Sequence, residues 1–315
     1  MEKEYDIVII GAGVTGLAAS MYAARLGMRS LVLGKTHGTE MPIGGVITTT
    51  DLVENYPGFI RITGEELADK IKEHATSYKE VEIRKEKVEK VEKKMGGFEV
   101  KSEKGTYFGK TILFATGTKW KKLEVAGAKE LENKGISYCA LCDGSLYKSK
   151  IVGVIGGSDS AAKDALVLAE HAKKVYIIYR KEKIRAEPIN LKRIKNNKKI
   201  EVINLTNVVG VIGKNKVEGV ILDKAYEGRK ELKLDGIFVA IGHEFLSGLA
   251  KEIGVKTNEK GEIIINKGTC ETNLPGVYAA GDVANSRFKQ AITGVAEGCI
   301  AAFSAFEFLK DRMKD

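Results

Sequence analysis

YDIVIIGAGVTGLAASMYAARL, residues 5–26, decides the fold. The stretch opens as a short apolar run typical of a strand and closes with the apolar spacing of a helix. Between them, Gly11 permits a tight turn, Gly13 lets the backbone approach a pyrophosphate, and Gly16 lets the helix pack on the strand. Because strand and helix flank the glycines in the required order, we interpret them as a dinucleotide-binding turn rather than a purely structural one.

One element of the dinucleotide-binding pattern is missing. Residues 29–33 have the pattern of the next parallel strand, and an acidic residue that bonds the ribose hydroxyl is expected at its end, about 20 residues after the glycines. Gly34 stands near that position instead. We therefore expect other groups to hold the ribose.

The same order of elements recurs in the second half of the chain. Residues 151–155 form an apolar strand, GGSDSA at 156–161 forms a glycine turn, and a helix to about residue 172 precedes a strand at 174–179. The chain has 315 residues, which is long enough for two domains. The repeat predicts an α/β fold with two Rossmann-like dinucleotide-binding domains.

The second domain is predicted to be inserted into the first. Strands at 111–114 and 238–243 close the two units in the same way, whereas residues 272–282 and a helix from about 289 to 309 have no counterpart in the second unit. We assign these last segments to the first domain. The predicted domains are residues 1–115 with 247–315, and residues 118–243.

The composition is that of a soluble globular protein. Hydrophobic residues make up 43% and charged residues 30% of the chain, which excludes disorder. The net charge of +9 comes from Lys and Arg interleaved with acids, as in residues 85–90, and no basic run contains aromatic residues. We therefore favour a solvated surface, which could also steer an acidic partner, over a nucleic-acid site.

Residues 1–6 do not resemble a signal peptide, and we expect no membrane span and a cytoplasmic location.

CALCD at 139–143 holds two cysteines separated by two residues. This spacing fits a redox disulfide, half of a zinc site or two buried thiols. Zinc needs about four ligands, and the other cysteines and the histidines are scattered, so we favour the redox pair and expect no metal. The spacing lets both sulfurs meet at the start of a helix, whose positive end favours the reactive thiolate. Asp143 can balance protons or cap that helix, and Cys270 and Cys299 are expected to be structural.

Four stretches together resemble the low-molecular-weight thioredoxin reductases, which are FAD-dependent pyridine nucleotide-disulfide oxidoreductases. They are GGVITTT at 44–50, ENYPG at 54–58, CALCD at 139–143 and GVYAAGD at 276–282, and their order and spacing match along nearly the whole chain. The resemblance implies that the first domain binds FAD and the second NAD(P)H, and that the Rossmann-like domains have a three-layer ββα arrangement.

The same resemblance implies roles for individual residues. Cys142 would face the flavin as the charge-transfer thiol, Cys139 would attack the disulfide of the partner, and Asp143 would supply or accept the proton. Asp282 would bind the ribityl chain, and residues 289–291 would lie along the isoalloxazine. The implied flavin-binding residues are Gly11, Gly13, Thr15, Gly16, Gly44, Gly45, Val46, Asn55, Val88, Thr116, Gly117, Gly281, Asp282, Lys289, Gln290 and Ala291.

The nicotinamide site departs from the family pattern. Ser158 replaces the second glycine, where a side chain would crowd the pyrophosphate, and Tyr179 replaces a histidine. Cations nearby resemble the set that grips a 2′-phosphate, so we favour NADPH over NADH and keep a surface charge cluster as the alternative. The candidate residues are Gly156, Gly157, Ser158, Asp159, Ser160, Arg180, Lys181, Arg185, Ile241 and Gly242.

The predicted function is an NADPH-dependent thioredoxin-disulfide reductase. By the resemblance, electrons pass through FAD and the Cys139/Cys142 disulfide to thioredoxin or a glutaredoxin-like protein, the enzyme is a homodimer, and the inserted domain rotates about hinges near Gly117 and Gly242. Three alternatives stay open: a relative fed by ferredoxin or another donor, a peroxide-forming NAD(P)H oxidase, and a redox sensor that does not turn over.

Overall fold

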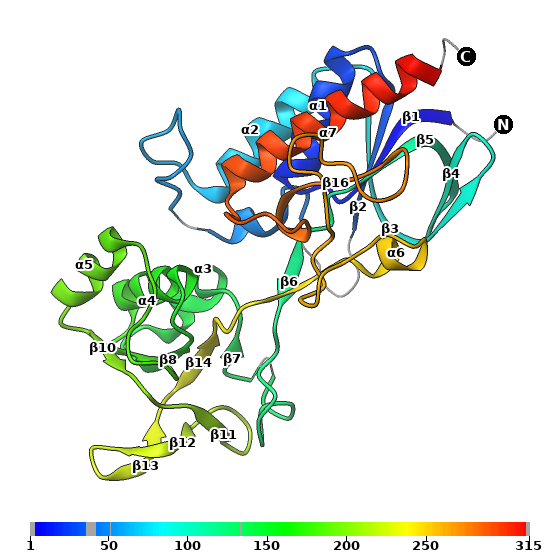
Figure 1. Cartoon of the computed structure of the whole chain (residues 1–315). Coiled ribbons are helices and arrows are strands. Elements are labelled where there is room, and N and C mark those ends of the chain that lie inside the picture. The colour runs from blue at the N-terminus through cyan, green and yellow to red at the C-terminus, as the bar shows by residue number, and fades with distance from the viewer. Residues whose placement is uncertain (1–3, 36–41, 51, 133, 313–315) are drawn as a thin grey trace. The chain divides into compact units, whose positions relative to one another are not determined.

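The computed structural model describes residues 4–35, 42–50, 52–132 and 134–312 and divides into two compact units (Figure 1). Unit 1 comprises Met1–Lys119 and Glu244–Asp315, and unit 2 comprises Trp120–His243. The chain leaves unit 1 after Lys119, a few residues later than predicted, and returns at Glu244. The fold is α/β with one unit inserted into the other, which confirms the predicted fold class.

A six-stranded sheet forms the centre of unit 1. Its strands are β1 (Glu4–Ile10), β2 (Ser30–Lys35), β3 (Val81–Lys94), β4 (Gly97–Ser102), β5 (Thr106–Phe114) and β16 (Val277–Ala279). Strands β3, β2, β1, β5 and β16 are parallel neighbours in that order, and β4 joins β3 to β5 by antiparallel pairing. The parallel strands end at one edge, where ligands bind in sheets of this class.

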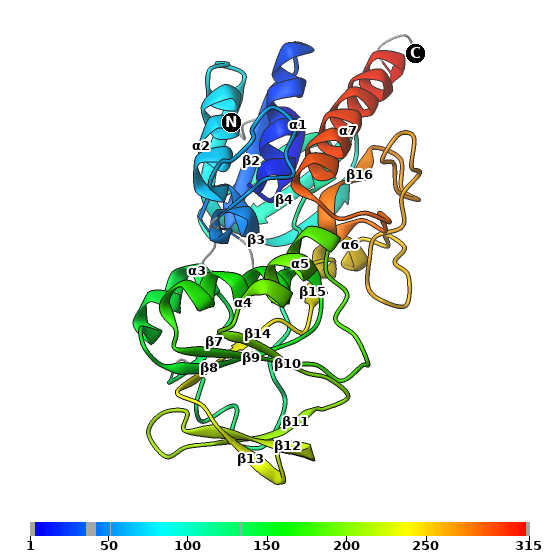
Figure 2. The same cartoon turned by 90° about the vertical axis from the view of Figure 1, so that its left-hand side faces the viewer.

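Three long helices belong to unit 1: α1 (Val14–Arg25), α2 (Gly64–Thr76) and α7 (Ala291–Arg312). Helices α1 and α7 lie side by side (Figures 1 and 2) because Gly298 has no side chain; a Cβ there would lie 2.4 Å from the Thr15 carbonyl oxygen. By length and composition alone, the 22-residue α7 could span a membrane, which we had expected of no segment. Ala301 and Ala305 on α7 belong to the hydrophobic core of unit 1.

Unit 2 has three layers (Figure 2). The middle layer is a parallel sheet in the order β10 (Ile200–Ile203), β9 (Lys174–Ile178), β8 (Ile151–Ile155), β14 (Gly236–Val239) and β7 (Ile136–Ser137). One face carries α3 (Ala140–Asp143), α4 (Asp159–His171) and α5 (Pro188–Asn196), and the other carries an antiparallel sheet of β11 (Val208–Ile212), β12 (Gly219–Tyr226) and β13 (Arg229–Lys233).

The two crossings between the units pair with each other. Strands β6 (Thr118–Trp120) and β15 (His243–Phe245) form a two-stranded sheet, after which the short α6 (Gly248–Glu252) begins. Gly117 and Gly242 precede these strands with φ of 64° and 112°, and a Cβ on either would meet no described atom within 4 Å. Glycine is therefore favoured there by backbone conformation and not by crowding, which is compatible with the predicted hinges.

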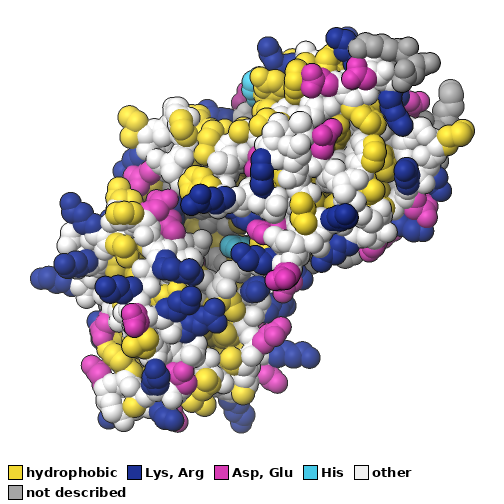
Figure 3. All heavy atoms as spheres, viewed as in Figure 1, with side chains coloured by type: hydrophobic (Ala, Val, Ile, Leu, Met, Phe, Trp, Pro, Cys, Tyr) yellow, Lys and Arg dark blue, Asp and Glu magenta, His cyan; other side chains and the backbone are white. Residues whose placement is uncertain are grey.

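Charge is distributed unequally between the units. Unit 1 contains 27 Lys and Arg against 27 Asp and Glu, and unit 2 contains 24 against 15, so the net charge of +9 lies entirely on unit 2. Figure 3 shows many Lys and Arg side chains over unit 2 at the lower left. Residues 173–199, here called the basic segment, contain 11 basic and 2 acidic side chains and account for the whole excess.

Candidate active site

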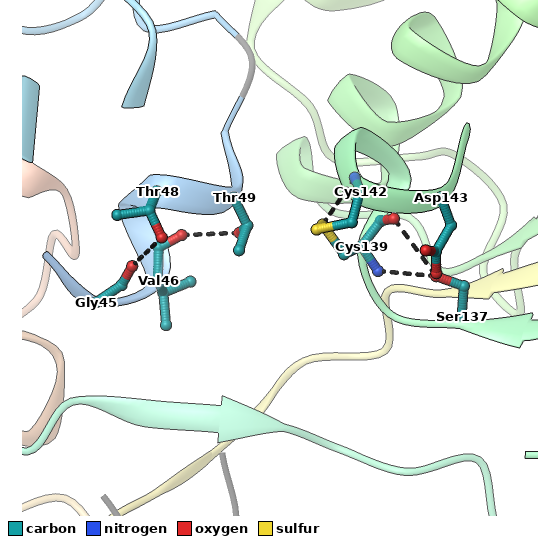
Figure 4. The surroundings of a disulfide bond; sticks show 8 residues. All are labelled: Gly45, Val46, Thr48, Thr49, Ser137, Cys139, Cys142 and Asp143. Atoms are coloured by element: carbon teal, nitrogen blue, oxygen red, sulfur yellow. Dashed lines mark hydrogen bonds between the residues drawn. A yellow bond between two sulfur atoms is a disulfide. The ribbon is translucent and has the colours of Figure 1, made fainter. Parts of the chain in front are cut away.

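Cys139 and Cys142 form a disulfide at the start of α3 (Figure 4). Cys139 is the N-cap residue of this helix, and its sulfur accepts a hydrogen bond from the Cys142 amide at 3.1 Å. Ala140 is buried in the core that α3 shares with α4, so the pair is fixed on the body of unit 2. The disulfide agrees with the redox interpretation of the motif.

Asp143 is linked to the disulfide through a serine that the sequence analysis did not identify. The Ser137 hydroxyl, buried in β7, donates to Asp143 Oδ2 at 2.6 Å and accepts from the Cys139 amide at 3.1 Å (Figure 4). The Asp143 side chain caps neither α3 nor the 3-10 turn Gly144–Tyr147, so the capping alternative is wrong. A polar residue two positions before the first cysteine was the only sequence signal for Ser137. The arrangement places the Asp143 carboxyl group beside the redox pair.

The glycine turn of unit 1 has room for a ligand. A Cβ on Gly11 would lie 2.2 Å from the Ala115 carbonyl oxygen, and one on Gly16 would lie 2.0 Å from that of Gly11, so the fold itself requires both glycines. In contrast, a Cβ on Gly13 would meet no atom of the described residues closer than 3.8 Å. The N-cap residue of α1 is Gly13, which has no side chain to bond the first amides of the helix, so within the described residues these amides are left for another acceptor. Gly13 therefore leaves a cradle that fits a pyrophosphate.

The absent acid at the end of β2 has a steric reason. A Cβ on Gly34 would lie 2.7 Å from the Cβ of Ala12, so the close approach of β2 to the glycine turn excludes a side chain at this position. Residues 36–41, which follow, lie outside the described residues. The described turn thus explains why the ribose-binding acid is missing where the pattern expects it.

Residues distant in the sequence gather around the unit 1 turn. Gly44 forms a bridge with Gly13, and the 3-10 turn Gly45–Thr49 follows, in which Thr48 and Thr49 donate to the carbonyls of Gly45 and Val46 (Figure 4). The turn η3, Gly281–Val283, packs on the first turn of α1, because a Cβ on Gly281 would lie 2.6 Å from Thr15 Oγ1.

Two further predicted flavin residues are in contact although 235 positions separate them: the side-chain Nδ2 of Asn55 donates to Gln290 Oε1 at 3.0 Å. Asp282 lies in η3, and Ala291 begins α7. The Thr116 hydroxyl is used within the protein, because it donates to the Leu246 carbonyl at 2.6 Å. Val88 is buried in the hydrophobic core of unit 1. Most of the predicted set therefore forms one region at the end of the parallel strands of unit 1.

The glycine turn of unit 2 is occupied by the protein's own side chains. A Cβ on Gly156 would lie 2.3 Å from the Ala240 carbonyl oxygen, and one on Gly157 would lie 2.3 Å from the ring of Tyr179. Ser158 caps α4, and its hydroxyl accepts from the Ala161 amide at 3.4 Å. The serine therefore uses a helix amide that the family's glycine would leave for a phosphate.

Asp159 acts as a clamp within unit 2. Its Oδ1 accepts from the Glu187 amide at 2.8 Å and from the side chain of buried Asn190 at 2.9 Å, and its Oδ2 pairs with Lys163 at 3.0 Å. Burial opposes the charged form, but the bonds from Asn190, Glu187 and Lys163 outweigh it and hold the pKa of Asp159 below its ordinary value. The carboxylate thus holds α5 against the start of α4.

The predicted phosphate-gripping cations lie beside this turn. The Arg185 amide donates to the Gly157 carbonyl at 2.6 Å, and Arg185 Nε donates to the Tyr179 hydroxyl at 3.2 Å. Tyr179 is buried, whereas the side chains of Arg180, Lys181 and Arg185 are exposed. Ser160 lies in the first turn of α4, and Ile241 and Gly242 follow β14. The cations are accessible to an anionic ligand.

The family model for pyridine nucleotide-disulphide oxidoreductases matches residues 5–298. The chain belongs to this family. A bifunctional thioredoxin reductase/thioredoxin of Mycobacterium leprae is 38% identical over 98% of this chain and 67% of that protein. A thioredoxin reductase of Bacillus subtilis is 37% identical over 98% of this chain and 96% of that protein. The crystal structure of T. acidophilum thioredoxin reductase superposes with a TM-score of 0.91 at 37% identity, covering 99% of this chain and 100% of that chain. The resemblance that the motifs indicated is confirmed.

The two remaining cysteines, Cys270 and Cys299, lie in surroundings that lower the reactivity of their thiols. Burial raises the pKa of the Cys270 thiol to about 12 and that of Cys299 to about 11. Both thiols are therefore protonated near neutral pH and react slowly, because the thiolate is the nucleophile. Cys270 is fully buried and donates to the Glu297 carbonyl at 3.5 Å. These environments agree with the structural role that we expected for both residues.

Proposed function

We propose that the protein is a flavin-dependent disulfide reductase that passes electrons from NADPH through FAD and the Cys139/Cys142 disulfide to thioredoxin or a glutaredoxin-like protein. The observation that supports this proposal most directly is the disulfide between half-buried Cys139 and exposed Cys142. Its first cysteine is joined to Asp143 through Ser137. Family membership and the open glycine turn of unit 1 support the flavin. We also propose a cytoplasmic homodimer, by resemblance alone.

Two groups of residues would hold the cofactors. The Gly11 to Gly16 turn, the Gly44 region and the η3 turn would hold FAD, and the Gly156 turn with its neighbouring cations would hold the nicotinamide nucleotide. Bound FAD supplies a carrier that takes a hydride from the nicotinamide and gives two electrons to a disulfide. The remaining chemistry belongs to the protein's own side chains.

The disulfide of unit 2 carries the electrons onward. Two electrons and two protons open the Cys139/Cys142 bond to a dithiol. The Cys139 thiolate then attacks the disulfide of the partner, forming a mixed disulfide and expelling a partner thiolate. Cys142 attacks Cys139 Sγ, restores the internal disulfide and releases the partner as a dithiol. Asp143, oriented by Ser137, accepts and returns the protons that these steps require.

The preference for NADPH over NADH is part of the proposal. It is supported by the exposed guanidinium of Arg185, which the Tyr179 hydroxyl orients, and by Arg180 and Lys181 beside it. Guanidinium groups recognise phosphate with strong charge-assisted bonds. No acidic residue stands at the end of β9, where an NADH site more often carries one.

A second candidate is the same reductase fed by another donor such as ferredoxin. One observation favours it: Ser158 uses an amide at the start of α4 and places a side chain where the family pattern has glycine. NADPH would then bind weakly, while flavin and disulfide chemistry stay unchanged.

Anaerobic flavin reduction separates these functions. We expect NADPH to bleach the yellow protein faster than NADH does, and an oxidised thioredoxin to restore the colour. Cys139→Ser and Cys142→Ser variants should bleach but fail to reduce thioredoxin. If dithionite bleaches the flavin and neither nicotinamide does, the second candidate replaces the first. If the protein binds no flavin, both are wrong.

A further inference from the structure

The ammonium group of Lys289 is fully engaged within unit 1. It donates to the carbonyl oxygens of Asp282, at 2.8 Å, and of Ala284, and it lies 3.1 Å from Glu262 Oε1. A lysine has three ammonium hydrogens, so these three acceptors use all of them. The same ammonium lies 4.9 Å from the centre of the Phe245 ring, at the end of β15. Lys289 thus acts on the protein's own turn and has no hydrogen left for a ligand.

Glu262 is a buried counter-charge for this lysine. Its side chain is 11% exposed, and its second oxygen accepts from the Asn258 amide group at 2.6 Å. Burial disfavours the carboxylate, yet the bonds from Asn258 and Lys289 hold the pKa of Glu262 below its ordinary value. The carboxylate is therefore ionised near neutral pH, and the ion pair persists there.

A second carboxylate holds the other end of the same turn. Glu297 on α7 accepts from the Gly281 amide at 2.8 Å through Oε2 and from the Ser286 hydroxyl through Oε1. The residues from Gly281 to Ala284 are thereby held at both ends by side-chain hydrogen bonds. A short 3-10 turn has few backbone bonds of its own, so such anchors determine its position.

We propose that the Glu262/Lys289 pair is the positioning device that holds the Gly281–Val283 turn against α1 and thereby sets the affinity for flavin. This inference rests on the proposed function, in which the turn with Asp282 contacts the flavin. Lys289 acts through the main chain of the turn and is a positioning residue. The resemblance implied that residues 289–291 lie along the isoalloxazine; within that segment, the Lys289 ammonium bonds the main chain of the turn and Glu262.

Flavin titration of the flavin-free protein tests the pair. In Lys289→Met, which keeps the aliphatic length, we expect the dissociation constant for FAD to rise about tenfold or more, since bonds from a charged group are lost. Glu262→Gln should raise it about threefold to tenfold, and Lys289→Arg should stay within about threefold of the wild type. Hydrogen exchange at residues 281–284 in the flavin-free protein should accelerate in Lys289→Met.

Lys267 supplies a matched control. Its ammonium also bonds a neighbouring carbonyl, that of Asn285 at 2.6 Å, but Lys267 is exposed and pairs with no carboxylate of the described residues. Lys267→Met should change the FAD dissociation constant less than about twofold. Unchanged FAD affinity in Lys289→Met, or the same loss in Lys267→Met, would overturn the inference. If the wild type bound no FAD, the proposed function would fail, while the exchange measurement would still decide whether the pair holds the turn.

Discussion

Unit 1 and unit 2 each place a glycine turn between a buried strand and a long helix, but only the first leaves that turn open. Within the described part of the chain, helix α1 has no side-chain cap and a Cβ on Gly13 would meet no atom within 3.7 Å. At the corresponding place in unit 2, Ser158 caps α4 with its own hydroxyl and Asp159 binds α5 across the turn. The same local pattern therefore yields one turn shaped for an external phosphate and one partly filled by its own side chains.

The two units also differ in net charge. Unit 1 is neutral, whereas the basic segment gives unit 2 its excess of +9. A neutral open turn suits a cofactor that is held by close backbone contacts. A basic surface suits an anionic ligand that arrives and leaves in each turnover, because its field raises the association rate. We infer that unit 2 compensates by charge for what its turn lacks in open amides.

The largest expected effect is at the open turn. Gly13→Ala should raise the dissociation constant for FAD about 100-fold, because the methyl group fills the cradle, while thermal unfolding of the flavin-free protein stays the same. Gly16→Ala is the contrasting variant: its methyl would overlap the Gly11 carbonyl oxygen, so it should lower the unfolding temperature. Equal FAD affinity in Gly13→Ala and wild type would show that the turn is not a phosphate cradle.

The next effect concerns the closed turn. Ser158→Gly should lower the dissociation constant for NADPH about tenfold, because it removes the side chain and frees the Ala161 amide. The cost in stability should be only a few tenths of a kcal/mol, as for other N-cap serines replaced by glycine. Fluorescence titration with NADPH measures the change. Weaker NADPH binding would mean that the serine hydroxyl is itself a ligand.

The charge difference is tested by removing lysines away from the turn. Replacing Lys192, Lys195 and Lys198 with Gln should lower the NADPH association rate about fivefold at low salt and less at 0.15 M, where charges are screened beyond about 8 Å. Stopped-flow measurements at several salt concentrations give the rates. The control is the exposed set Lys214, Lys216 and Lys224, which lies outside the basic segment. Equal losses in both triple variants would contradict steering by the basic segment.

Tyr179→Phe should produce a smaller and more selective effect. Removing the hydroxyl takes away the acceptor that orients Arg185 Nε. The guanidinium is then less well placed for the 2′-phosphate, so NADPH should bind about threefold more weakly and NADH equally well. The ring remains to pack beneath Gly157, which keeps the turn intact. Equal losses for both nucleotides would show that the hydroxyl orders the turn rather than the phosphate grip.

The last effect concerns stability and not binding: it is the pH dependence of the Asp159 clamp. Because the pKa of Asp159 is lower in the folded protein, its stabilising bonds are fully present above its unfolded value of about 3.9 and disappear as pH falls through the folded value. Asp159→Asn should therefore lose about 1 kcal/mol of unfolding free energy at pH 7 and less at pH 3. Denaturant titrations at both pH values test this, and a pH-independent difference would contradict it.

The family, the two glycine turns and the redox cysteines follow from the sequence by itself, because each depends on residues close together in the chain whose spacing has a fixed geometric meaning. The links between distant segments do not. Only the tertiary structure joins Asn55 to Gln290 and Glu262 to Lys289, and it also decides that Ser137 contacts Asp143, although these two residues lie only six positions apart. These contacts require the folded sheets and helices to bring separate segments within hydrogen-bond distance, and no local spacing records which polar side chains will meet. The sequence thus determined what chemistry the chain carries, and tertiary packing decided which side chains hold that chemistry in position.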